Sequence, residues 1–348
     1  MDDVIKNAVK FNCDVSDAQF WGYFSICGLL LRYRDLYRTE QGLKPWDNIR
    51  HEEIAAWISR KESKWPELER RGFRSLSIDG RTYDAFDVAE INNAINAQGL
   101  VYGAGYGMYL KPTFYLAELH SKRTLSGLTV YTSKKEYVRD LFTSPGMLQG
   151  TSVFLRLEPL TALLHYKYSE LNARRVSALE DAFAHYGFRH RQIADETFAR
   201  RMEELAERYA EVILHHELAE YREEVPEWKG ILALAGDRKV EHYLRAVKDL
   251  IADTSEHGAY RMIIDRRDRG ALGLTIALLE GYRRAIYPEM KAAYDEFLQH
   301  EDWPAIERSR KAGYERFSAR RDAIIRFYRD GNGKEEFNKK IGEFLHTP

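Results

Sequence analysis

The sequence of 348 residues lacks three features: an excess of charge of one sign, a long hydrophobic run, and more than two cysteines. Its 53 lysines and arginines balance 54 aspartates and glutamates, which leaves a formal net charge of -1. This balance provides no general basic field for nucleic acid or anionic lipid. We therefore expect neither a nucleic acid nor a membrane as a partner.

The longest apolar run near the N-terminus, Phe20 to Leu31, is 12 residues long. It is too short to span a bilayer, and aspartates rather than basic residues precede it, which excludes a signal peptide. We predict instead a buried helix over about residues 17–40. Cys13 and Cys27 would lie roughly 20 Å apart if both were on that helix, too far for a disulfide. The simplest prediction is a reduced, cytoplasmic protein.

The length exceeds the range in which a single hydrophobic core keeps growing, and 44% of the residues are hydrophobic, so we expect two well-packed domains. Glycine is unevenly distributed: 12 of 23 glycines lie in residues 1–150, whereas only Gly187 occurs between Thr151 and Lys229. Long helices are therefore expected after residue 150. We predict a mainly α protein with an N-terminal α+β domain, residues 1–158, and a C-terminal irregular helical bundle, residues 159–348.

Short runs rich in β-branched and aromatic residues, separated by turn residues, predict a small antiparallel sheet in the first domain. The expected strands are 76–78, 113–117, 128–132 and 152–157, and the expected helices are 51–62, 88–97 and 134–142. The second domain is predicted to be helical over about 159–186, 195–224, 238–253, 270–286, 288–299 and 303–329. No internal repeat or sustained heptad pattern is present, which favours an irregular bundle.

The most specific signal lies in the helix over about 196–224. When residues are placed at 100° steps, His216 continues an apolar stripe, Glu220 shares its face one turn later, and Glu217 lies at the edge of that face. Imidazole and carboxylate groups on one face are typical ligands of a divalent metal such as Zn or Fe. We predict a metal site with His216 and Glu220 as ligands and Glu217 as an edge ligand or base.

Two known metal motifs and one structural role provide other interpretations of this helix. The stretch His216 to Glu220 matches the HExxH zinc motif only in part, because its second histidine is a glutamate, and the ExxH spacing of di-iron bundles occurs only from Glu343 to His346. Further ligands would have to come from elsewhere in the chain. The candidates are His165, His185 and His242. Alternatively, His216 is a buried histidine bonded to Glu220 or to a backbone carbonyl, in a non-catalytic scaffold or interaction protein.

A glycine- and tyrosine-rich segment over 99–109 offers a different hypothesis. Gly103, Gly105 and Gly107 would allow successive backbone N–H groups to form an anion-binding nest, with Lys111 nearby, in a phosphate- or nucleotide-binding enzyme. The segment matches neither the Walker A motif nor the dinucleotide fingerprint. A tight glycine-rich connection, with its tyrosines packed on the sheet, is the open alternative.

A cluster of charged residues follows the first apolar run: Arg32, Arg34, Asp35, Arg38 and Glu40. Asp35 continues the apolar stripe of the expected helix, so we predict that it is partly buried and paired, most simply with Arg38. Two interpretations remain open, a structural ion-pair network and a site for an anionic ligand.

Four motifs carry a resemblance: GLKPW over 42–46, YGAGYG over 102–107, KPTFYL over 111–116 and HELAE over 216–220. In these the chain resembles a family of uncharacterised bacterial cytoplasmic proteins, over most of its length. The resemblance implies one coherent protein of two parts and assigns no activity, substrate or catalytic residue. Whether the protein is an enzyme, what its oligomeric state is, and whether its partner is a small molecule or a protein stay open.

Overall fold

The computed structural model describes residues 3–173, 176–331 and 333–345. It divides into two compact units, unit 1 with Met1–Tyr166 and Ala194–Ala210, and unit 2 with Lys167–Ile193 and Glu211–Pro348. The long helix α8 (Glu196–Arg222) therefore contributes its first half to unit 1 and its second half to unit 2. Within the described residues, no helix combines the length and the hydropathy that crossing a membrane requires.

Unit 1 begins with two helices where the sequence predicts one. These are α1 (Asp3–Phe20) and α2 (Ile26–Gln41), separated by a short 3-10 turn. The prediction of one buried helix over 17–40 is therefore wrong. The Ser25 side chain accepts a hydrogen bond from the Gly28 amide and caps a new helix. The apolar run is also not buried, because Ile26 is 80% exposed and Leu31 is 54% exposed.

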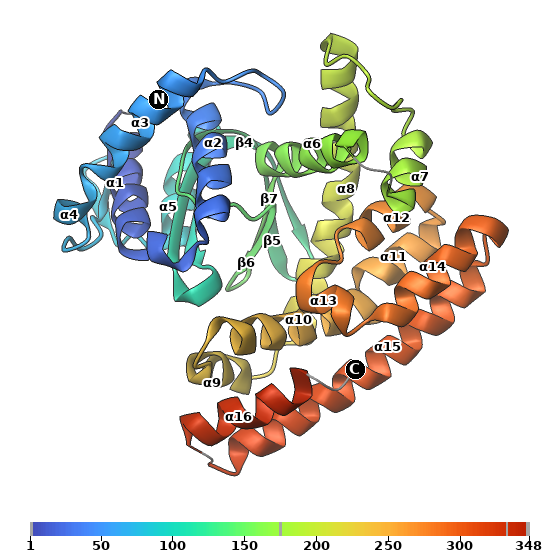
Figure 1. Cartoon of the computed structure of the whole chain (residues 1–348). Helices are drawn as coiled ribbons and strands as arrows, with labels where there is room; N and C mark the ends of the chain where they lie inside the picture. Colours follow the sequence, from blue (N-terminus) through green and yellow to red (C-terminus); the bar gives the residue numbers. More distant parts are fainter. Residues whose placement is uncertain (1–2, 174–175, 332, 346–348) are drawn as a thin grey trace. The chain divides into compact units, whose positions relative to one another are not determined.

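Two sheets follow (Figure 1). Strands β1 (Leu76–Ile78) and β2 (Arg81–Tyr83) form an antiparallel pair. The larger sheet has the order β3-β4-β5-β7-β6. Its strands are β3 (Leu100–Tyr106), β4 (Pro112–Leu125), β5 (Leu128–Arg139), β6 (Gly146–Gln149) and β7 (Ser152–Arg156). All pairings in it are antiparallel except that of β5 with β7. Of the predicted strands, 76–78 lies in the small antiparallel pair, whereas 113–117, 128–132 and most of 152–157 lie in this larger mixed sheet.

Most of the segment 134–142 lies in a strand rather than the predicted helix, because β5 continues to Arg139. Lys134 and Arg139 both lie within β5, and residues from 128 to 139 pair with β4. The run of charged residues there resembles a helix surface in sequence, but hydrogen bonding to a neighbouring strand overrides that local preference.

Helices cover this larger sheet of unit 1. Helix α1 packs on β4 and β5, α2 packs on β5, and α5 (Val88–Ile95) packs on β3. Ile5, Val9 and Cys13 of α1 join Tyr102 and Phe114 of the sheet in one buried core. The unit also contains α3 (His51–Glu62), α4 (Trp65–Leu68) and most of α6 (Leu157–Ala173).

The elements of unit 2 in its described part are all helices, as predicted (Figure 1). The single helices expected over 159–186 and 270–286 are, however, two helices each. Beyond the second half of α8 it contains α7 (Ser177–His185), α9 (Glu227–Leu234), α10 (Arg238–Thr254), α11 (Ala259–Arg266), α12 (Arg269–Ala277), α13 (Gly281–Ala285), α14 (Pro288–His300), α15 (Trp303–Arg329) and α16 (Lys334–Leu345). Helix α10 packs against α11, α13, α15 and α16. It is therefore a central element of this unit, and most of its last three turns is buried.

Candidate metal centre

Helices α8 and α10 each contribute two side chains to one cluster in unit 2. His216 and Glu220 lie one turn apart on α8, and Asp249 and Asp253 lie one turn apart on α10. Residues four apart share a helix face. Ligand atoms of His216, Glu220 and Asp249 all lie within 4.8 Å of one another. An imidazole and two carboxylates thus converge on one point.

Asp253 determines how the imidazole of His216 is oriented. The Nδ1 atom lies 2.7 Å from Asp253 Oδ1, whereas Nε2 lies 4.0 Å from Glu220 Oε1. The side chains are well covered, with 21% of His216, 15% of Glu220 and 8% of Asp253 exposed. A carboxylate bound to one ring nitrogen, with the other nitrogen directed at further ligands, is the usual arrangement behind a metal-binding histidine.

The cluster is rich in acidic side chains, and these shift the pKa values of its members. Burial lowers the pKa of His216, but Asp253 and then Glu220 outweigh burial and raise this pKa to about 10. Burial, and next the charge of Glu220, raise the pKa of the neighbouring Glu217 to about 8. Burial also raises the pKa of Asp249, against the opposing effect of Arg283. Crowded, buried carboxylates retain protons when too little positive charge is near, because ionising them without a counter-charge is unfavourable. A bound cation would supply that counter-charge.

Two basic side chains reach the edges of the cluster. Lys248 Nζ lies 3.7 Å from Glu220 Oε1 but only 3.1 Å from Glu224 Oε2. Arg283 Nη1 lies 3.8 Å from Asp249 Oδ2. The closer partner of Lys248 is therefore outside the three-residue group, and the lysine can remain with Glu224 while Glu220 binds another cation.

The structure brings together only some of the residues that the sequence suggested. His216 and Glu220 belong to the group, and Glu217 is buried beside them without being one of its members. His165 lies in unit 1 next to Trp46 and Phe198. His185 and His242 are not members of the group either, and His346, the end of the predicted ExxH pair, lies outside the described residues.

Sequence reasoning missed Asp249 and Asp253. The signal that marks them is present, because two aspartates one turn apart flank the buried residues Leu250, Ile251 and Ala252 of an amphipathic helix. An acidic pair beside a buried stripe needs a partner on the facing element. Helical periodicity alone, however, does not show that α8 provides that element.

The glycine-rich segment is a strand of the large sheet, not the predicted loop. Gly103 and Gly105 pair with Tyr115 and Thr113 of β4 and have no positive φ. A Cβ atom at Gly103 would lie 2.0 Å from Tyr115 Cε1, and one at Gly105 would lie 2.1 Å from Gln149 Cδ. These glycines allow close side-chain packing rather than an anion-binding nest. Gly107, just beyond the strand, likewise has an extended conformation.

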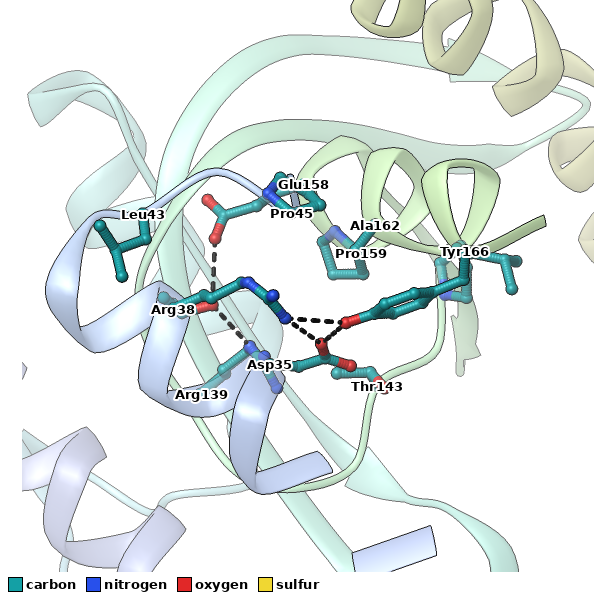
Figure 2. A pocket seen from close by; sticks show the side chains of 13 residues that line it. Asp35, Arg38, Leu43, Pro45, Arg139, Thr143, Glu158, Pro159, Ala162 and Tyr166 are labelled. Carbon is teal, nitrogen blue, oxygen red and sulfur yellow. Dashed lines mark hydrogen bonds and ion pairs between the residues drawn. The ribbon is translucent and has the colours of Figure 1, made fainter. Parts of the chain in front are cut away.

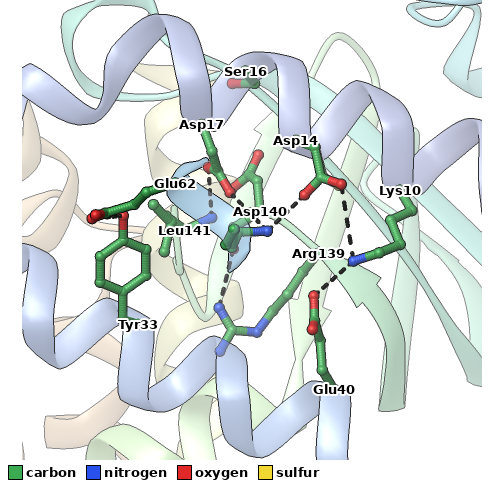
Figure 3. Close-up of polar contacts among 12 residues, drawn as sticks. Lys10, Asp14, Ser16, Asp17, Tyr33, Glu40, Glu62, Arg139, Asp140 and Leu141 are labelled. Atoms are coloured by element: carbon green, nitrogen blue, oxygen red, sulfur yellow. Dashed lines mark hydrogen bonds and ion pairs between the residues drawn. The ribbon is translucent and has the colours of Figure 1, made fainter. Parts of the chain in front are cut away.

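Lys111 is part of a buried ion-pair network, not a free cation beside a loop. It is 2% exposed, and its Nζ lies 3.3 Å from Asp17 Oδ1 and 3.4 Å from Asp140 Oδ2. Figure 3 shows the acidic side chains Asp14, Asp17 and Asp140 gathered between α1 and the end of β5. Two carboxylates already neutralise this ammonium, so its geometry does not favour the phosphate- or nucleotide-binding hypothesis.

Two family models match the chain. The N-terminal domain model of a family of unknown function (DUF6866) matches residues 4–156, and the C-terminal domain model of the same family matches residues 161–346. No curated protein and no solved structure matches significantly. The chain belongs to the DUF6866 family, for which the models give no activity.

Proposed function

We propose that this member of the DUF6866 family binds a divalent metal ion in its C-terminal part. His216 Nε2, Glu220 and Asp249 would be the ligands, and Asp253 would orient the imidazole. One observation carries the proposal: one ligand atom from each of the three residues lies within 4.8 Å of the others, on two helices, and Asp253 already holds Nδ1 of His216. Relative to the sequence-based hypothesis, Asp249 takes the place of Glu217 as the third ligand.

The ligand chemistry restricts the type of ion. One imidazole nitrogen and two carboxylate oxygens suit Zn²⁺, Fe²⁺ or Mn²⁺ better than ions that require only oxygen or only sulfur ligands. Three protein ligands leave further coordination positions for water or a small molecule. With an ion present, Nδ1–H of His216 would donate to Asp253 while Nε2 faces the ion. A role of Glu217 as a base at the edge of this site remains part of the proposal.

Metal analysis of the purified full-length chain tests the proposal directly. Protein stripped with a chelator is titrated separately with Zn²⁺, with Mn²⁺ and, without oxygen, with Fe²⁺, and bound metal is measured by mass spectrometry after gel filtration. We expect about one equivalent of at least one ion. If every metal stays below a few tenths of an equivalent, the proposal fails and the His216–Asp253 pair has a structural role, as in the scaffold hypothesis.

Metal binding should strengthen as the pH rises. Without metal, the folded protein holds protons on His216 up to about pH 10 and on Glu217 up to about pH 8, above their ordinary pKa values of 6.5 and 4.5. Because these pKa values are raised by folding, the stability they provide is present at low pH and is lost as pH rises through the folded-state values. A metal ion must replace the proton of His216.

We therefore expect the metal to raise the melting temperature more at pH 9 than at pH 6, with apparent affinity rising up to about tenfold per pH unit for one displaced proton. Thermal melts with and without the ion at both pH values measure this. The Glu204→Gln variant is the matched control and should keep the pH dependence, since Glu204 forms an exposed ion pair with Arg200 outside the ligand group. Equal increments at the two pH values would contradict proton displacement.

We also propose that the protein is cytoplasmic. Both cysteines are free, and the Cys27 thiol is exposed. An exposed cysteine without a disulfide partner in the chain is typical of a reducing compartment.

A further inference from the structure

A separate cavity of about 180 Å³ lies within unit 1. Figure 2 shows it bounded by α2, by the turn that follows α2, and by α6. One part of its wall is polar, with Arg38, Asp35 and Tyr166 in contact with one another. The opposite part is apolar and includes Leu43, Pro45, Pro159 and Ala162. The cavity thus has the two-sided character of a small-molecule site.

The guanidinium group of Arg38 lacks a full set of acceptors. The residue is 8% exposed, its Nη1 donates to Tyr166 Oη at 3.2 Å, and its Nη2 donates to the Asp47 carbonyl at 3.4 Å. The Asp35 carboxylate is 3.8 Å away. Among the described residues, the buried Nε atom has no hydrogen-bond partner. An arginine has five N–H donors, and leaving a buried one unpaired is costly.

We infer that this cavity binds a small organic carboxylate, with the carboxylate at Arg38 and the hydrocarbon part against the proline and leucine side chains. The planar guanidinium matches a carboxylate in a two-point contact. A cavity of roughly 150 Å³ accommodates benzene, so this one has space for a ligand of about that size with one polar head group. The sequence left open a site for an anionic ligand near Arg38, and this cavity is where we infer that site to be.

The other charged groups of the wall are already engaged, and they favour a monoanion. The Tyr166 hydroxyl donates to Asp35. Thr39 donates to Glu158 Oε1 at 3.1 Å and the Glu136 amide donates to Glu158 Oε2 at 2.8 Å. Arg139, the second arginine of the wall, lies with its Nε 3.4 Å from Glu136 Oε2 and donates to Thr39 Oγ1 at 3.1 Å. With Arg139 paired in this way, the two acidic side chains of the wall repel a dianion such as phosphate more than a single carboxylate. Free amino acids and simple organic acids share the carboxylate, so both are candidate sources.

The test is isothermal titration of the full chain with benzoate, with leucine and with inorganic phosphate. We expect benzoate, leucine or both to bind, and Arg38→Lys to weaken that binding by about tenfold to a hundredfold, because lysine keeps the charge but loses the two-point contact. Arg50→Lys, at an exposed ion pair with Glu53, is the matched control and should leave binding unchanged.

A second variant keeps the test decisive if Arg38→Lys does not fold. Ala162→Leu adds side-chain volume to the cavity wall on α6 without altering Arg38, and it should abolish binding while near-ultraviolet circular dichroism stays native. Three results would overturn the inference: no binding of either carboxylate at millimolar concentration, binding that folded Ala162→Leu retains, or a preference for phosphate.

Discussion

Replacing His216 with alanine should weaken divalent metal binding by more than roughly a hundredfold, because the change removes the only nitrogen ligand of the proposed set. Glu220 and Asp249 would remain as an incomplete set of ligands. Asp253 would no longer have an imidazole to orient. Titration of chelator-treated protein with the ion that binds the wild type, followed by calorimetry, gives the ratio of dissociation constants.

Two further variants separate metal ligation from general damage. Asp253→Asn keeps the shape of the side chain but weakens the hydrogen bond to His216 Nδ1. It should lower the affinity for the metal ion by about 10- to 100-fold. Glu204→Gln alters an exposed carboxylate earlier on α8 that pairs with Arg200, away from the cluster, and should bind like the wild type. If His216→Ala binds metal as tightly as the wild type, while both proteins are folded, the ligand assignment is wrong.

The Lys111→Met variant should be less stable than the wild type by about 3–5 kcal/mol. The ammonium of Lys111 lies between the fully buried carboxylates of Asp17 and Asp140 and also donates to Ser16 Oγ at 2.7 Å. Burial already raises the pKa of Asp17 to about 6 with this cation in place. Without the cation, two buried carboxylates face one another, and the ammonium of Lys61, 3.9 Å from Asp17 Oδ2, compensates only one of them. Urea unfolding monitored by tryptophan fluorescence measures the loss.

A double variant and a surface control complete this experiment. Adding Asp17→Asn to Lys111→Met removes one of the two buried carboxylate charges that Lys111 no longer neutralises, so part of the lost stability should return. Lys10→Met breaks an ion pair with Glu40 in which 44% of the lysine side chain is exposed, and should cost about 1 kcal/mol or less. Equal losses for Lys111→Met and Lys10→Met would show that the buried network contributes no special stability.

Half of the candidate metal centre could be predicted from local periodicity. His216 and Glu220 are four residues apart, and a helix necessarily places them on one face. Asp249 and Asp253 lie about thirty residues further along, on another helix. Their position opposite His216 depends on how α8 and α10 pack, and spacing within a single helix contains no information about that packing.

Strand assignments divide in the same way. The run at 76–78 was correctly predicted, because alternating burial leaves a local signature. The charged stretch at 134–142 and the glycine-rich stretch at 99–109 were predicted wrongly, since residues 134–139 and 100–106 are strands through hydrogen bonds with β4. In β3, the glycines are required by Tyr115 and Gln149, which come from other parts of the chain.

By itself the sequence determined the helical character of the second half, the presence of a small sheet in the first half, and the shared face of His216 and Glu220. These follow from backbone geometry within a few residues. Only the tertiary structure decided that Lys111 is enclosed by Asp17 and Asp140, that Asp249 and Asp253 complete the acidic cluster, and that Arg38 faces a cavity. Such pairings arise because burial brings distant charges together, where the loss of water makes their mutual interaction decisive.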